Sequence, residues 1–189
     1  MSILRTKINT SESFEQRAFL RAAVVILYSH WEGFVKSSTK AYVEFINTQR
    51  IKYSDLKPCF LVFGAKKHLN FISQSKRHRK NSHSLSLLFL ENGKIAFIDS
   101  TTNLDTESNL KSIVFDDIAF SVGLDTSQYE TRYNFIDEVL LKRRNSIAHG
   151  EFLEIDVDEF NSALNDTLGL MRQYKNDILN CIEEEKYKR

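Results

Sequence analysis

The sequence has few of the residues that break or cross-link a chain. Its 189 residues include one proline, six glycines and two cysteines. So few proline and glycine residues argue against a turn-rich β-sandwich and against a Pro/Gly-rich linker. Cys59 and Cys181 are isolated and lack metal-type spacing, which argues against a disulfide scaffold and indicates a reducing compartment. Helix is therefore the expected structure.

Long apolar runs are also missing. The longest, at residues 22–28, is far shorter than the roughly 20 residues that a membrane-spanning helix needs. Residues 1–7 lack the apolar core of a signal peptide. We therefore expect a cytoplasmic protein that does not span a membrane.

The pattern of apolar residues predicts several helices. The first begins at Ser11 or Ser13 and runs to about residue 49, and others are expected at about 58–73, 108–123, 127–148 and from 156 to near the end. Asp156 and Glu159 have the spacing of a capping box. Residues 74–84 read as a basic loop. The apolar runs 87–90 and 95–98 flank Asn92 and Gly93, a combination that predicts a small β-hairpin at 85–98.

These elements predict an all-α fold, an antiparallel bundle of four to five helices in a single domain over residues 1–189. The basic loop and hairpin at 76–100 are expected as an insertion. The net charge is only +1, but no acidic residue occurs between Asp55 and Glu91, where seven basic residues lie. Such local asymmetry can make a basic face on a near-neutral protein.

One short run carries the strongest chemical signal. Arg144, Asn145 and His149 place a guanidinium, an amide and an imidazole at the tail of a predicted helix, just before Gly150. A fixed cation can hold a phosphate and an imidazole can move protons near neutral pH, so the pattern favours metal-free cleavage of a phosphodiester. The structural alternative is that cations, histidine and glycine are ordinary residues at a helix C-terminus.

The run from Arg144 to Gly150 resembles the Arg-(four to six residues)-His signature of the HEPN superfamily, all-α proteins that include many ribonucleases. It looks like the branch with an Arg-Asn-x-Ile-Ala-His-Gly motif, the MAE_28990/MAE_18760-type HEPN proteins. Residues 28–35, 106–110 and 123–125 are similar to further segments of that branch. The resemblance covers most of residues 14–180, and the basic loop and hairpin are not part of its signature.

The resemblance implies a metal-independent endoribonuclease without a cofactor. Such enzymes use the RNA 2′-hydroxyl as nucleophile and leave a 2′,3′-cyclic phosphate. It also implies a homodimer with a composite active site, and a toxin or antiphage-defence effector with a cognate antitoxin or a defence-system partner. The chemistry favours two copies independently, because transesterification needs a base and an acid and each motif supplies one histidine.

Within this interpretation, we expect His149 to act as acid and base, Arg144 to clamp the phosphate, and Asn145 to act as an orienting residue of the site. Glu32 on the first helix is expected to support Arg144 or His149, with an ordinary surface glutamate as the equal alternative. RNA phosphates are expected to contact four basic residues, Lys76, Arg77, Arg79 and Lys80. The alternative is a solvated loop that binds nothing. The histidines of this region lack the partners of a metal site, so no metal is expected.

Two other functions remain open. One is a non-catalytic HEPN-like module that binds RNA or a partner protein, and the other is a purely structural dimerisation domain. The intact set of Arg144, Asn145 and His149 favours the enzyme over the non-catalytic module. A purely structural dimerisation domain would leave the basic loop unexplained.

Overall fold

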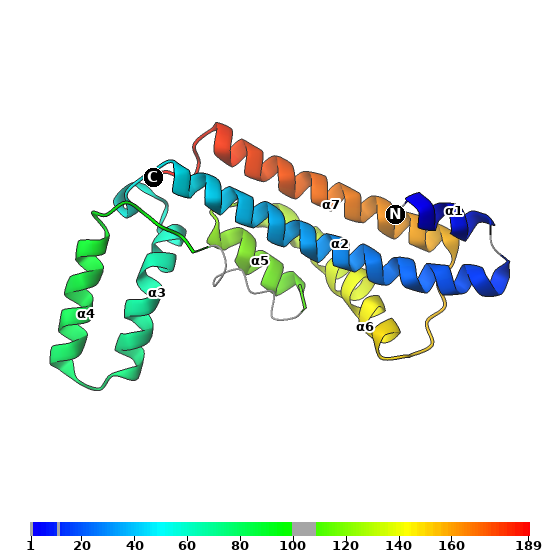
Figure 1. Cartoon of the computed structure of the whole chain (residues 1–189), viewed down its shortest axis with the longest axis horizontal. Helices are drawn as coiled ribbons and strands as arrows, with labels where there is room; N and C mark the ends of the chain where they lie inside the picture. The colour runs from blue at the N-terminus through cyan, green and yellow to red at the C-terminus, as the bar shows by residue number, and fades with distance from the viewer. Residues whose placement is uncertain (1, 11, 100–108) are drawn as a thin grey trace. The chain divides into compact units, whose positions relative to one another are not determined.

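The computed structural model describes residues 2–10, 12–99 and 109–189 (Figure 1). Within these ranges the chain is helical and contains no β-strand, only the isolated bridges Lys52–Ile95 and Leu56–Lys188. The all-α expectation is confirmed, although the helices are more numerous than the four or five expected. They are α1 (Ser2–Thr10), α2 (Ser13–Thr48), η1 (Tyr53–Asp55), α3 (Pro58–Gln74), α4 (His78–Glu91), α5 (Ser112–Ser121), η2 (Ser127–Arg132), η3 (Phe135–Lys142), α6 (Arg143–Ala148) and α7 (Val157–Glu183).

The chain forms two compact units. Unit 1 comprises Met1–Ser37, Thr106–Asp116 and Thr126–Asn176, and unit 2 comprises Ser38–Asp105, Asp117–Asp125 and Asp177–Arg189. Helices α2, α5 and α7 therefore contribute residues to both. None of the helices in the described part of the chain is both long enough and apolar enough to span a membrane.

Unit 1 is built around four aromatic rings. The ring of Phe115 in α5 lies 5.2 Å from Trp31 of α2, 5.0 Å from Tyr129 of η2 and 5.4 Å from Tyr174 of α7, measured between centroids. All four side chains are fully buried. Aromatic pairs at such spacings contribute about 0.5–1.5 kcal/mol each beyond their burial. The cluster anchors η2, which leads through η3 into α6 and the Arg144–His149 run.

The last helix begins as the sequence predicts. The backbone N–H of Glu159 donates to Asp156 Oδ1 at 2.7 Å, and the N–H of Asp156 donates to Glu159 Oε2 at 3.4 Å. This reciprocal pair satisfies two N–H groups that a helix start leaves without partners. The capping box is confirmed.

The predicted hairpin at 85–98 is wrong. Residues 87–90 belong to α4, and Asn92 and Gly93 form the turn that ends this helix, where the N–H of Gly93 donates to the carbonyl of Leu90 at 3.4 Å. The segment forms a helix rather than a strand because the partly or fully buried residues of α4 recur at positions 81, 84, 88 and 91, which is the spacing of one helix face. The second run is extended but pairs elsewhere, with the N–H of Ala96 donating to Ile51 O at 2.7 Å.

The predicted loop at 74–84 is also largely helical. Only residues 75–77 separate α3 from α4, which lie side by side as a helical hairpin (Figure 1). The amide of Asn81 donates to the carbonyl of Ser75 at 2.9 Å and closes this short connection. Lys76 and Arg77 therefore lie in the connection, and Arg79 and Lys80 lie in the first turn of α4.

Other boundaries shift modestly. The first long helix begins at Ser13, while Ser11 lies outside the described residues, as does the expected start of the middle helix at Ser108. Helix α1 was not expected. The segment predicted as one helix over 127–148 consists of the 3₁₀ segment η2, the π-helical η3 and the α-helical α6 in succession.

Candidate active site

The Arg144–His149 run ends α6 in a tight helix stop. His149 is the C-cap residue and Gly150 follows with φ of 77°, a conformation that glycine adopts without strain. The N–H of Gly150 donates to Ile147 O at 3.1 Å, and the N–H of Glu151 donates to Ser146 O at 2.9 Å. This pair of bonds is the Schellman motif, which fixes the backbone at the imidazole. The His149 side chain is exposed.

Arg144 is held on the face of a buried tyrosine. Its guanidinium carbon lies 4.4 Å from the centroid of the Tyr28 ring, and its Nη1 donates to Asn145 Oδ1 at 2.7 Å. A guanidinium at this distance from an aromatic face gains about 0.5–2 kcal/mol, depending on how far it is desolvated. The stacking and the hydrogen bond together orient a long, half-buried side chain that would otherwise be mobile.

Tyr28 is itself fixed by hydrogen bonds. Its hydroxyl oxygen accepts the N–H of Leu110 at 2.7 Å. Burial raises the pKa of Tyr28, the main effect, and the Glu32 carboxylate raises it further through its charge and a hydrogen bond, while the Leu110 N–H and Arg144 act in the opposite direction. The phenol thus remains neutral at physiological pH. Glu32 also pairs with Lys36 one turn further along α2, at 2.8 Å.

The segment after the motif is fixed by Arg21 of α2. Its guanidinium donates to the carbonyl oxygens of Glu151 at 3.0 Å and Leu153 at 3.4 Å. A hollow of about 570 Å³ lies between this part of α2 and residues 150–154. Phe14 and Phe152 line it, and they are 81% and 82% exposed. An open, partly apolar hollow therefore begins at Gly150, the residue that follows His149.

The structure brings some of the predicted site residues together. Arg144 and Asn145 are hydrogen bonded, and Glu32 reaches Arg144 indirectly, through Tyr28. The neighbouring Arg143 points instead to the first turn of α7, with 3.6 Å between its Nη2 and Glu159 Oε1. The four basic residues predicted to bind RNA belong to unit 2, whereas the motif belongs to unit 1.

Two residues of this site were not singled out from the sequence. Tyr28 was noted only as part of a resembling segment, and Arg21 was not noted at all. The available signal was their position on the apolar first helix, where a phenol or a guanidinium needs a polar partner. That signal does not name the partner, because the partners are far away in the chain.

The described residues contain no cluster of three or more side chains suited to a metal ion. They do contain a positioned cation and an accessible imidazole, which are the groups needed to hold a phosphate and to transfer a proton.

Comparison with known families identifies the chain. The family model described as RiboL-PSP-HEPN matches residues 2–180. The chain belongs to the RiboL-PSP-HEPN family. Members of this family are generally ribonucleases, so RNA is the implied substrate.

The expected HEPN superfamily is thereby confirmed. The match is to the RiboL-PSP-HEPN family and does not distinguish the MAE_28990/MAE_18760-type branch. One of the segments that suggested this branch, 106–110, lies mostly outside the described residues. No curated protein and no solved structure matches the chain significantly.

Proposed function

We propose that this RiboL-PSP-HEPN protein is a metal-independent endoribonuclease. The observation that carries the proposal is a preset arginine on the same short helix that ends at an accessible histidine: Arg144 is oriented by Tyr28 and Asn145, and His149 is presented by the Schellman turn. The similarity of this run to the HEPN branch with the Arg-Asn-x-Ile-Ala-His-Gly motif supports the same assignment.

In this mechanism Arg144 binds the scissile phosphate and stabilises the charge that develops on it. His149 takes the proton of the 2′-hydroxyl, whose oxygen attacks the adjacent phosphorus. The bond to the 5′-oxygen breaks, and this oxygen receives a proton from a second imidazole. The products are a 2′,3′-cyclic phosphate on the upstream fragment and a free 5′-hydroxyl on the downstream fragment. Asn145 acts as a positioning residue for Arg144 directly, and Glu32 does so through Tyr28.

A second copy of the chain supplies the second imidazole in our proposal. The hollow beside the motif supports this, because Phe14 and Phe152 expose apolar area there while Arg17, Glu151 and Glu154 provide both signs of charge. A surface that carries an apolar centre and both charges can be self-complementary across a two-fold axis. We propose a toxin or antiphage-defence effector as the biological role, held inactive by a cognate antitoxin or a defence-system partner.

The test of the chemistry is cleavage of a 5′-labelled RNA in excess chelator. We expect cutting to persist, to leave a cyclic phosphate, and to stop when every 2′-hydroxyl is replaced by methoxy. The His149→Ala variant should lose cleavage. His30→Ala is the matched control, because His30 is also an exposed histidine of unit 1. A requirement for a divalent metal, or cleavage by His149→Ala at the wild-type rate, would leave a non-catalytic RNA- or protein-binding module as the better function.

The composite site has a quantitative test. Inactive His149→Ala protein is mixed with wild-type protein at varied ratio and constant total concentration, after subunit exchange. If both imidazoles are needed, activity follows the square of the wild-type fraction, because only wild-type pairs cut. A linear dependence would show that one chain is sufficient.

A further inference from the structure

The hairpin formed by α3 and α4 carries a groove to which the proposed mechanism assigns no part. A hollow of about 660 Å³ lies between the two helices, within the range of about 300–1,000 Å³ typical of ligand pockets. A second hollow of about 350 Å³ lies at the tip of the hairpin. The two share Phe71, Gln74 and Lys80 as lining residues, so they adjoin one another and are together called the groove.

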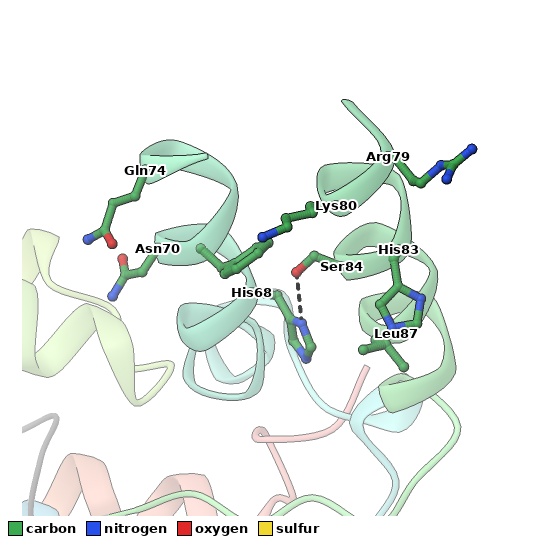
Figure 2. A pocket seen from close by; sticks show the side chains of 9 residues that line it. His68, Asn70, Gln74, Arg79, Lys80, His83, Ser84 and Leu87 are labelled. Carbon is green, nitrogen blue, oxygen red and sulfur yellow. Dashed lines mark hydrogen bonds between the residues drawn. The ribbon is translucent and has the colours of Figure 1, made fainter. Parts of the chain in front are cut away.

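The groove combines an aromatic ring with cations. Phe71 is 45% exposed although it is a large apolar side chain. Lys80 reaches from α4 toward α3, as Figure 2 shows, and Lys76 and Arg77 line the hollow at the tip. No acidic residue occurs in the chain between Asp55 and Glu91, so the only carboxylate in the sequence of this hairpin is at the last residue of α4. A ligand that is both planar and anionic fits this chemistry.

Polar groups complete the larger hollow. His68 Nδ1 and Ser84 Oγ are hydrogen bonded at 3.1 Å across the two helices (Figure 2). Ser84 is buried, so this bond ties α3 to α4 beneath the groove. Asn70 and Gln74 of α3 also line the hollow, and Figure 2 shows their side-chain amides directed away from α4.

The placement of the cations also favours an anion. Arg79 and Lys80 lie in the first turn of α4, and this turn contains no acidic residue. The positive end of the helix dipole makes cations unfavourable there and anions favourable. A bound phosphate would reverse this electrostatic cost.

We infer that this groove binds an unpaired nucleotide of single-stranded RNA. The base stacks on Phe71 in the larger hollow, and the flanking phosphates lie along Lys76, Arg77 and Lys80. A base can enter only when it is unpaired, so the groove selects single-stranded segments over duplex. The inference rests on RNA being the substrate and adds which form of RNA the protein holds.

The test uses His149→Ala protein, so that RNA is bound without being cut. Single-stranded RNA should bind at least tenfold more tightly than the same sequence in a duplex. Phe71→Leu should weaken single-strand binding about tenfold, because base stacking on an aromatic ring is lost, and should leave duplex binding and the salt dependence unchanged. Phe89→Leu is the matched control, since Phe89 is an exposed phenylalanine on α4 that lies outside the groove.

Charge is tested separately. Arg77→Ser and Lys80→Ser should each flatten the slope of log K against log[salt] by about 0.7, the value for one phosphate contact on a single strand. Lys175→Ser, an exposed charge on α7, should leave the slope unchanged. A single 2-aminopurine in the RNA should be quenched on binding to the parent protein and not on binding to Phe71→Leu.

Thermal melting establishes that each variant is folded. If Phe71→Leu binds single-stranded RNA as the parent does, or loses duplex and single-strand binding equally, the inference is overturned while the proposed cleavage can stand. If the wild-type chain does not cut RNA but the binding pattern holds, the proposed function fails and the groove stands.

Discussion

Replacing Tyr28 by phenylalanine or by leucine separates two roles of this side chain. Tyr28→Phe removes only the hydroxyl and leaves the ring on which Arg144 stacks, 4.4 Å from the guanidinium carbon. Tyr28→Leu removes both. The two variants share the loss of the hydrogen bond from Leu110, so a difference in cleavage between them reports on the ring and its packing rather than on the hydroxyl.

The size of each effect follows from the contacts. Without the hydroxyl, the N–H of Leu110 is left buried and without its acceptor, which costs about 1–3 kcal/mol. In a chain of this length each kcal/mol lowers Tm by about 2–4 °C. Tyr28→Leu should cost more, because it also leaves unfilled volume in the core. Loss of a cation–π contact worth about 0.5–2 kcal/mol should lower kcat by about 2- to 30-fold in Tyr28→Leu.

The assays are urea unfolding and single-turnover cleavage of a labelled RNA in excess chelator, both well below the melting temperature. We expect Tyr28→Phe to be destabilised but to cleave faster than Tyr28→Leu, and Tyr28→Leu to be strongly impaired in both assays. The reasoning is refuted if Tyr28→Phe loses as much activity as Tyr28→Leu, or if Tyr28→Leu cleaves as the wild type does.

Three further outcomes are expected. Arg144→Lys should recover little of the roughly 10²–10³-fold rate that Arg144→Ala loses, because an ammonium lacks the planar fork; single-turnover cleavage measures this. Asp137→Ala should lower the unfolding free energy by about 1–3 kcal/mol in urea titrations, since its carboxylate accepts the N–H of Ser112 at 2.7 Å and the hydroxyl at 2.6 Å. Burial raises the pKa of Tyr42 above the ordinary 10.0, so the folded state favours the neutral phenol. The contribution of this phenol to stability is complete below pH 10 and should be lost as pH rises through the higher folded-state pKa. Urea unfolding at pH 9 and 11 should therefore show a smaller loss in Tyr42→Phe than in the wild type, and an equal loss would contradict the assignment.

Much of the helical structure could be predicted because its signals lie within a few residues of each other. The apolar period of α2, the proline at the first position of α3 and the capping box of α7 are local patterns, and each marks a helix start that the structure confirms. The glycine stop after His149 is local in the same way.

The hairpin failed because two local signals conflicted. An Asn-Gly pair between apolar runs favours a β-turn, but the same two residues can end a helix. The choice depended on packing, since α4 lies against α3 and the 95–98 run has its own partner in Ile51. The first contact is made by a whole neighbouring helix and the second by a residue far away in the chain, so neither is visible in the pattern of residues 85–98 itself.

The candidate site divides in the same way. Arg144, Asn145 and His149 could be recognised from their spacing, because one helix end presents all three. What holds Arg144 could not, since Tyr28 is on α2 and the Leu110 N–H that fixes it comes from a third segment. Spacing along a helix determines which residues share a face, whereas a contact between distant segments exists only once the core has packed. Local sequence was therefore sufficient to name the candidate groups, and tertiary packing decided how the arginine is oriented.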